Sequence, residues 1–309
     1  MNRQVSVIVP VYNSEKTLPL LFDRLISVLI SCCKNFEIVF IEDNGRDNSW
    51  QIINDLSRKD SRVRGAKMSR NYGQHNALLC GIRMAKYDVV VTIDDDLQNP
   101  PEEIPNLLLK MDEGYDVVYG TPAMEQHGLW RDLASKMTKI ALQSTMGAET
   151  AKMVSAFRAF KTSIRSAFNN YQSSFVSIDV LLTWGTNRFS AIPVKHEDRK
   201  IGTSNYTFRK LITHAFNMMT GFSILPLQLS SLIGFFFTLF GIGVLGYVIV
   251  RYLMAGTPVQ GFPFLASIIA IFSGAQLFSL GIIGEYLARM HFRIIDRPPY
   301  NIGILTSSE

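Results

Sequence analysis

The chain has 309 residues, which is enough for one large domain and a smaller appendage. Hydrophobic residues make up 47% of it and charged residues only 18%, so the apolar excess must be concentrated in one part of the chain. The net charge of +5 is dispersed rather than gathered into basic runs, which argues against nucleic acid as a partner.

Cysteine usage and the N-terminus both indicate an intracellular location. The three cysteines show no C-x-x-C spacing, so the sequence predicts neither a disulfide framework nor a zinc site. Met1 is followed almost directly by an apolar run, without the basic region and apolar core of a secretory signal. We therefore expect the N-terminal half to lie in a reducing cytosol.

The first two thirds of the chain alternate between strand-like and helix-like segments. The expected strands are Val5–Val9, Phe36–Glu42, Asp88–Ile93 and Asp116–Tyr119. The expected helices are Thr17–Ile30, Trp50–Leu56, Gln74–Ala85 and Glu102–Met111. This order predicts a Rossmann-like, doubly wound α/β domain with a mostly parallel sheet.

The first two expected strands each end in a turn that suits a nucleotide. The first turn reads V-P-V-Y-N and contains Pro10 and Tyr12, and the second contains Asp43. Because both turns fall at the same edge of the sheet, a planar ligand could stack on Tyr12 while Asp43 accepts the ring N–H of a uracil. The alternative is a pair of ordinary capped turns.

The turn before the third expected helix is a weaker signal. Asn71 and Gly73 lie in this turn, where they could approach a nucleotide, and His75 is better explained as a surface residue than as a base. Small residues recur at every fourth position down one face of the helix, which lets it pack close to the sheet. These are Ala77, Gly81 and Ala85.

The most informative segment is the acidic turn V-T-I-D-D-D-L-Q-N-P-P, which places three carboxylates directly after an apolar strand. Alternate residues of an extended segment face the same side, so Asp94 and Asp96 can point together at one divalent cation and a diphosphate, whereas Asp95 faces elsewhere. Adjacent carboxylates repel one another, and a divalent cation supplies the counter-charge. An acidic surface turn or helix cap is the alternative.

The apolar excess lies near the C-terminus. Between Lys210 and Glu285 the only formally charged residue is Arg251. The stretches 229–250 and 262–284 are each long enough to cross a bilayer core of about 30 Å. A hairpin of core helices is the alternative, but neither stretch has a polar face. Basic residues precede the first stretch and follow the second, so the positive-inside rule places both ends in the cytoplasm, although Arg251 lies on the other side. The preceding segment, Thr207–Thr220, fits an interfacial helix or one packed on the globular domain.

In this order, the motifs resemble the polyprenyl-phosphate glycosyltransferases of family 2. That group includes dolichol-phosphate mannose synthase, bactoprenol glucosyltransferase and undecaprenyl-phosphate 4-deoxy-4-formamido-arabinose transferase. The resemblance covers essentially the whole chain, including the two apolar stretches. Besides the turns above, it is carried by R-N-Y-G-Q-H, F-R-A-F, R-K-I-G-T-S-N-Y, G-E-Y-L-A-R and R-P-P-Y.

The resemblance implies a GT-A catalytic domain with a defined set of site residues. Asp96 and Gln98 would hold Mg²⁺ or Mn²⁺, and Asp94 would orient the donor. The residues expected to bind the nucleotide are Pro10, Tyr12, Asp43, Asn71, Asp94 and Asp95. The residues expected to meet the acceptor phosphate are Arg131, Lys136, Arg199 and Ser204. The expected catalytic residues are Asp94, Asp96 and Arg199.

This sequence departs from its relatives at several positions near these site residues. Bactoprenol glucosyltransferases carry an Asp where Ala156 stands, so no base is expected there; a phosphate acceptor is already ionised and needs none. Ser14 replaces a common Glu, so the ribose contact could pass to Glu15 or to the main chain. Asn205 replaces a common Lys, which removes one positive charge from the expected acceptor site.

The expected function is inverting transfer of one sugar from a UDP-sugar to undecaprenyl (polyprenyl) phosphate at the cytoplasmic face of a bacterial inner membrane, for cell-envelope glycans such as lipopolysaccharide. The partners would be both substrates, the membrane and further copies of the chain. One rival is a processive polysaccharide synthase, which generally needs more membrane helices and a Q-x-x-R-W motif. Another is a non-catalytic partner of a flippase, against which the intact acidic turn argues.

Four parts of the chain are expected on this basis. Residues 1–206 would form the GT-A catalytic domain and 207–221 the amphipathic juxtamembrane helix. Residues 222–288 would form the two-helix transmembrane anchor and 289–309 a cytoplasmic tail.

Overall fold

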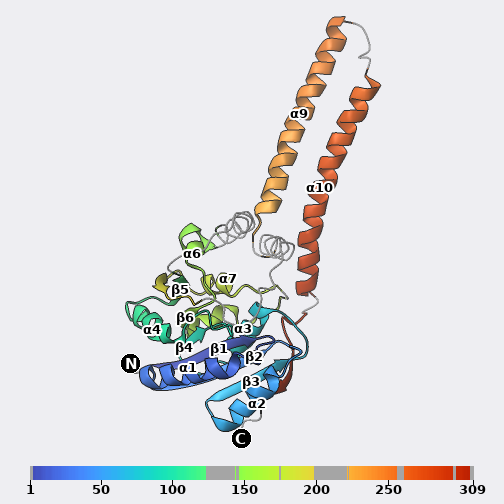
Figure 1. The fold of residues 1–309 in the computed structure, drawn as a ribbon. Coiled ribbons are helices and arrows are strands. Elements are labelled where there is room, and N and C mark those ends of the chain that lie inside the picture. The colour runs from blue at the N-terminus through green and yellow to red at the C-terminus, as the bar shows by residue number, and fades with distance from the viewer. Residues whose placement is uncertain are drawn as a thin grey trace.

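The computed structural model describes residues 3–122, 143, 146–173, 175–197, 221, 223–255, 261–294 and 297–306. These residues form a globular α/β domain from which two long helices project side by side (Figure 1). The expected juxtamembrane helix lies outside the described residues, except for Gly221.

One sheet of eight strands forms the centre of the domain. The strands are Gln4–Val11 (β1), Asn35–Glu42 (β2), Val63–Met68 (β3), Val89–Thr92 (β4), Val117–Pro122 (β5), Arg158–Lys161 (β6), Phe189–Val194 (β7) and Ile302–Leu305 (β8). Their order across the sheet is β7-β5-β6-β4-β1-β2-β3-β8.

Helices cover both faces of the sheet or project from the domain. The domain helices are Leu18–Cys32 (α1), Ser49–Lys59 (α2), Gln74–Met84 (α3), Ile104–Asp112 (α4), Ala148–Met153 (α6) and Ile178–Thr183 (α7). Short 3₁₀ turns occupy Pro101–Glu103 (η1) and Thr162–Phe168 (η2). The projecting helices are Leu225–Ala255 (α9) and Phe262–Ile294 (α10).

The expected fold class is confirmed: the sheet is mixed but mostly parallel. Strand β1 pairs in parallel with β2 and β4, and β2 pairs in parallel with β3. Strand β6 runs antiparallel between β4 and β5, and β8 runs antiparallel to β3. The four expected strands correspond to β1, β2, β4 and β5, whereas β3, β6, β7 and β8 were not expected from the sequence.

The two faces of β1 build two cores, because successive side chains of a strand point to opposite sides. Val5, Val7 and Val9 pack in the cluster that includes α1 and α4, whereas Ile8 packs in the cluster that includes α3. Helix α3 crosses β1 so closely that a Cβ on Gly81 would lie 2.2 Å from Ile8 Cγ2. The glycine is therefore needed for this approach, as the small-residue spacing predicts.

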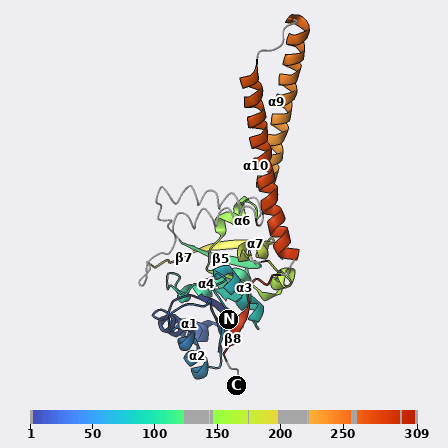
Figure 2. The ribbon, with the colours of Figure 1, turned by 90° about the vertical axis from the view of Figure 1, so that its right-hand side faces the viewer.

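Helices α9 and α10 run away from the domain in both views (Figures 1 and 2). Their segments Leu225–Met254 and Ile271–His291 have mean hydropathies of 2.3 and 1.3 and are long enough to cross a membrane. Of their most apolar windows, 0% is buried within the described structure. A core-helix explanation therefore does not apply, because core helices bury their apolar side chains.

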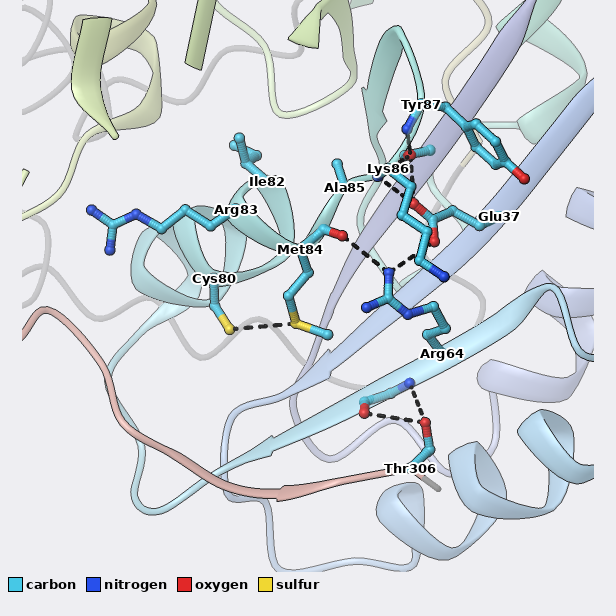
Figure 3. A network of polar contacts seen from close by, with 12 residues as sticks. Glu37, Arg64, Cys80, Ile82, Arg83, Met84, Ala85, Lys86, Tyr87 and Thr306 are labelled. Carbon is cyan, nitrogen blue, oxygen red and sulfur yellow. Dashed lines mark hydrogen bonds and ion pairs between the residues drawn. The ribbon is translucent and has the colours of Figure 1, made fainter. Parts of the chain in front are cut away.

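After α10 the chain returns to the domain and adds β8 to the outer edge of β3. Figure 3 shows this edge, where Thr306 Oγ1 accepts the Gly65 N–H at 2.9 Å and donates to the Gly65 carbonyl at 3.3 Å. Arg64 of β3 donates to Glu37 Oε2 and to the Met84 carbonyl, each at 3.0 Å. The segment that follows the long helices thus becomes part of the sheet.

Candidate functional site

A pocket of about 240 Å³ opens at the carboxyl ends of β1, β2 and β4. Ligands of parallel α/β sheets bind at this edge, because the loops that follow the strands meet there. The pocket is lined by Pro10, Val11, Tyr12, Asp43, Asn71, Gly73, Gln74, Ala77, Asp94, Asp95 and Asp96. All six residues expected to bind the nucleotide are among them.

The three aspartates after β4 face this pocket but have different partners. Asp94 Oδ1 accepts a hydrogen bond from Gln74 Nε2 at 2.7 Å. Asp95 Oδ2 accepts from the Tyr12 N–H at 3.1 Å and from the Ser14 hydroxyl, so its carboxylate fixes the turn after β1. The expectation that Asp95 faces elsewhere is wrong, because Asp95 lines the same pocket as Asp94 and Asp96. Residues 95 and 96 lie in a turn, where the alternation of an extended segment does not hold.

Charge is concentrated at these aspartates. Burial raises the pKa of Asp94 to about 7, and repulsion from Asp96 and Asp95 adds to the rise. Burial also raises the pKa of Asp95 to about 6, although the hydrogen bonds from Ser14 and Tyr12 oppose it. The protein therefore holds negative charge where water is partly excluded, and a bound cation would relieve this cost.

The acidic turn contains an unusual main-chain conformation at Leu97. Its φ is 63°, in the left-handed region that residues with a branched side chain seldom adopt, and its side chain is buried in the core. Asn13 and Asn44, in the turns after β1 and β2, have φ of 56° and 55°, which asparagine tolerates. No feature of the sequence indicates the Leu97 conformation, which turns the chain sharply after Asp96.

Asp43 has a second role that the sequence did not reveal. Its side chain is only 3% exposed, and burial raises its pKa. Oδ1 accepts the Tyr72 N–H and Oδ2 accepts the Gly73 N–H, both at 2.7 Å. Asp43 thus anchors the turn that carries Asn71 while it lines the pocket.

Tyr12 lies at the rim with 45% of its surface exposed.

Some expected site residues are not brought to the pocket. Gln98 does not line it; its N–H donates to Asp96 Oδ1 at 3.1 Å and its carbonyl accepts the Glu197 N–H at 2.8 Å. Glu15, suggested as a ribose contact, accepts the Asn48 N–H at 3.1 Å. The residues expected at the acceptor phosphate lie outside the described ranges. These are Arg131, Lys136, Arg199 and Ser204.

A buried ion pair supports the strands beneath the acidic turn. Arg158 of β6 is 1% exposed and pairs with Asp179 of α7, which also accepts the Tyr119 hydroxyl at 3.1 Å. In the sheet Arg158 pairs with Thr92, and Thr92 precedes Asp94 by two residues in the chain. The F-R-A-F run carried no such role in the sequence-based expectations. An arginine inside an apolar strand is the signal that could have indicated a buried ion pair.

The donor set fits a divalent cation that is shared with a substrate. Within the described ranges, no three acidic, histidine or cysteine side chains are grouped so that they could hold a metal by themselves. Mg²⁺ is usually bound through one or two carboxylates together with substrate phosphates, and Asp94 and Asp96 both line the pocket.

Comparisons with known proteins agree with this geometry. The family model described as Glycosyl transferase family 2 matches residues 6–171. An undecaprenyl-phosphate 4-deoxy-4-formamido-L-arabinose transferase from Shewanella sediminis is 36% identical over 301 residues, which cover 96% of this chain and 91% of that protein.

Two solved structures share the fold at low sequence identity. Glucosyl-3-phosphoglycerate synthase from Mycobacterium tuberculosis, in complex with Mn²⁺, UDP and glucosyl-3-phosphoglycerate, has a TM-score of 0.51 at 16% identity and covers 71% of this chain and 78% of its own. Mannosyl-3-phosphoglycerate synthase from Rubrobacter xylanophilus has a TM-score of 0.52 at 14% identity, with coverages of 71% and 73%. The globular domain therefore has a GT-A-like α/β fold.

Proposed function

The chain belongs to glycosyl transferase family 2, and on that premise we propose that it transfers one sugar, with inversion, from a UDP-sugar to undecaprenyl phosphate. The observation that carries the proposal is the 36% identity, over 96% of the chain, with a transferase named for this acceptor. The pocket with three aspartates and the two long apolar helices agree with a nucleotide donor and a lipid acceptor.

The donor would bind at the carboxyl ends of β1, β2 and β4. Tyr12, exposed at the rim, offers a ring on which uracil can stack, and Asp43 offers a carboxylate for its N–H. Asp96, with Asp94 beside it, would hold Mg²⁺ or Mn²⁺ against the diphosphate; Gln98 remains a predicted ligand. The cation would supply a Lewis acid for the charge on departing UDP.

The acceptor needs no general base, because its phosphate oxygen is already ionised at neutral pH. That oxygen forms a bond to the anomeric carbon while the bond from this carbon to UDP breaks, and UDP leaves with the electron pair. Bringing two anions together requires cationic side chains on the acceptor side. We assign this task to Arg131, Lys136, Arg199 and Ser204, of which Ser204 contributes a hydroxyl.

The membrane anchor would consist of α9 and α10. Both helices are apolar and exposed, and basic residues flank the pair, so the positive-inside rule places the globular domain and both termini in the cytoplasm. The inner membrane of a bacterium is the location that fits an undecaprenyl acceptor. The corresponding parts are residues 1–206 (catalytic), 207–221 (juxtamembrane), 222–288 (anchor) and 289–309 (tail).

The first experiment measures transfer by the full chain in detergent. Purified protein is incubated with undecaprenyl phosphate, with either Mg²⁺ or Mn²⁺, and with each of a panel of radiolabelled UDP-sugars. The panel includes the UDP derivative of 4-deoxy-4-formamido-L-arabinose. We expect label from one donor to pass into the organic phase. If no UDP-sugar labels the lipid, the proposed function is wrong.

Substitution of Asp96 tests the role of the acidic turn. We expect Asp96→Ala to lower transfer by more than about a hundredfold, because stabilisation of the leaving diphosphate is worth several kcal/mol. The matched control is Asp55→Ala, which removes an exposed carboxylate of α2 and should leave transfer unchanged. Full activity of Asp96→Ala would contradict the assignment.

A further inference from the structure

The loop that precedes α7 leads to a contact with helix α3. This bridging loop comprises residues 171–173 and 175–177. Directly after it, at the first residue of α7, the Ile178 N–H donates to His75 Nδ1 at 3.3 Å. His75 is in the first turn of α3, next to Gln74, whose amide holds Asp94 in the pocket. The residue that follows the bridging loop therefore contacts His75, the neighbour in sequence of the pocket residue Gln74.

The same loop also touches the second apolar helix. The guanidinium carbon of Arg289 lies 4.2 Å from the centre of the Phe175 ring, a cation–π contact. The Tyr171 hydroxyl donates to the Phe175 carbonyl at 2.6 Å, which ties the aromatic residue to the rest of the loop. Helix α10 thus contacts the bridging loop through the Arg289 side chain.

Arg289 is itself held in place by its neighbours. Its side chain is 10% exposed, and Nη2 donates to Glu285 Oε1, one helical turn earlier, at 2.8 Å. On the same helix, the Tyr286 hydroxyl donates to the Ser223 carbonyl at 2.5 Å, just before α9 begins. A Cβ on Gly221 would lie 3.5 Å from Arg289 Nη1. Both views show this end of α10 beside the globular domain (Figures 1 and 2).

These contacts give a task to the G-E-Y-L-A-R motif, which the site above leaves without one. Glu285, Tyr286 and Arg289 are its polar members. Arg289 contacts Phe175 of the domain, Glu285 pairs with Arg289 within α10, and Tyr286 joins α10 to the residue before α9. Arginine suits such a junction, because its planar guanidinium can stack on a ring and pair with a carboxylate at the same time.

We propose that Arg289 is a positioning residue for glycosyl transfer, which acts through Phe175 to hold the donor pocket in a fixed orientation toward the lipid phosphate. This inference rests on the proposed function. The anomeric carbon and the phosphate oxygen must approach to about 3–3.5 Å in line, and small misplacements are costly. A domain that rocks on a loose junction meets this geometry less often, although its pocket is intact.

The experiment compares full-length variants in detergent with undecaprenyl phosphate and the active UDP-sugar. We expect Arg289→Met and Phe175→Leu each to lower kcat about tenfold. Neither should change the KM for the UDP-sugar or the affinity for UDP, because the pocket residues are untouched. Arg289→Lys, which keeps the cation, should restore part of the rate. The matched controls are Arg251→Met and Phe235→Leu, which alter exposed side chains of α9.

Several results would overturn the proposal. Wild-type kcat in both Arg289→Met and Phe175→Leu would show that the contact does not matter. A loss in Arg289→Met with full activity in Phe175→Leu would show that Arg289 meets the lipid phosphate itself. Should Arg289→Met fail to fold, as judged by gel filtration, the milder Phe175→Leu decides.

A second measurement needs no substrate and separates this inference from the proposed function. Hydrogen exchange at the amides of residues 175–178 should be faster in Arg289→Met and in Phe175→Leu than in the wild type. Unchanged exchange would overturn the proposal even if the wild type transferred no sugar to lipid. Conversely, absence of transfer by the wild type, with faster exchange in both variants, would contradict the proposed function and leave the contact between Arg289 and Phe175 as a junction without that role.

Discussion

At the scale of single residues, Asp43 joins a structural task to a proposed binding task. Each oxygen of its buried carboxylate accepts one main-chain N–H of the turn before α3. The remaining lone pairs are available to a ligand in the pocket. The position of Asn71 and the proposed recognition of uracil therefore depend on one side chain.

Replacement of this carboxylate by an amide should separate Asp43 from its turn. In Asp43→Asn only one oxygen can still accept, and the new NH₂ group faces a main-chain N–H, at a cost of about 1–3 kcal/mol. We expect weaker UDP binding, measured by calorimetry, and a lower melting temperature. Asp60→Asn, which alters a comparable contact to the main-chain N–H of Arg62 outside the pocket lining, is the control. Wild-type UDP affinity in Asp43→Asn would contradict the assignment.

Asp116 at the start of β5 is a second charged centre, and it is not part of the pocket. Burial alone would raise the pKa of Asp116, but hydrogen bonds from Lys161, Arg188 and Thr186 outweigh burial and lower it to about 2. The Lys161 ammonium is 2.7 Å from Oδ1, and Arg188 donates to both oxygens at 2.9 Å. This carboxylate joins the strand ends of β5, β6 and β7.

The lowered pKa of Asp116 predicts how stability depends on pH. Its value of about 2 in the folded protein is below the ordinary value of about 3.9, so its contribution is complete above about pH 4 and is lost as the pH falls toward 2. We expect Asp116→Asn to melt at a lower temperature than the wild type at pH 6, and the difference to shrink below pH 4. A difference that does not vary with pH would contradict the ionic explanation.

At the scale of elements, the crossing of α3 over β1 decides where the pocket residues of α3 lie. Gly81 permits the crossing, because a side chain there would meet Ile8 Cγ2 at 2.2 Å and Ile41 Cγ1 at 3.2 Å. The first turn of the same helix carries Gln74, which holds Asp94. Packing in the middle of α3 therefore fixes a contact at its end.

We expect Gly81→Ala to destabilise the domain by about 1–3 kcal/mol through overpacking, although alanine has the higher helix propensity. Denaturant unfolding of the detergent-solubilised chain would measure the change. Ile8→Ala removes the colliding methyl group, so the double variant Ile8→Ala/Gly81→Ala should lose less stability than the sum of the two single variants. Strict additivity of the two losses would show that the predicted collision does not occur.

At the scale of the whole molecule, the described residues show two attachments of the long helices to the domain. One is the junction at Arg289 and Phe175, and the other is β8, which pairs with β3 after the chain leaves α10. Thr306 ends this pairing. Its N–H donates to the Gly65 carbonyl at 2.9 Å, and its hydroxyl accepts the Gly65 N–H at 2.9 Å. Both attachments therefore lie at the C-terminal end of the pair of long helices, one near the end of α10 and one after it.

A proline at the end of β8 should loosen the second attachment. Thr306→Pro removes both the N–H and the hydroxyl that bond to Gly65, whereas Thr306→Ala removes only the hydroxyl. We expect hydrogen exchange at Gly65 and across residues 302–305 to be fastest in Thr306→Pro and intermediate in Thr306→Ala. Equal exchange in the wild type and Thr306→Pro would show that this pairing does not stabilise the edge.

Much of the fold, and the list of pocket residues, could be predicted from local pattern. Apolar runs bounded by turns indicated β1, β2, β4 and β5, and long uncharged runs indicated α9 and α10, since these signals lie within one segment. The pocket aspartates were found in the same way, because they directly follow a strand. The strands β3, β6, β7 and β8 were missed, since each depends on neighbours that are distant in the chain.

The sequence by itself determined the α/β class of the domain, the acidic turn and the apolar helices, because periodicity and hydrophobic length are properties of neighbouring residues. Only the tertiary structure decided that Asp43 holds the turn at Tyr72 and that Arg158 pairs with Asp179. It also decided that Thr306 bonds to Gly65 across 241 positions. Such contacts depend on which strands pair and how helices cross them, and a single sequence does not encode that locally.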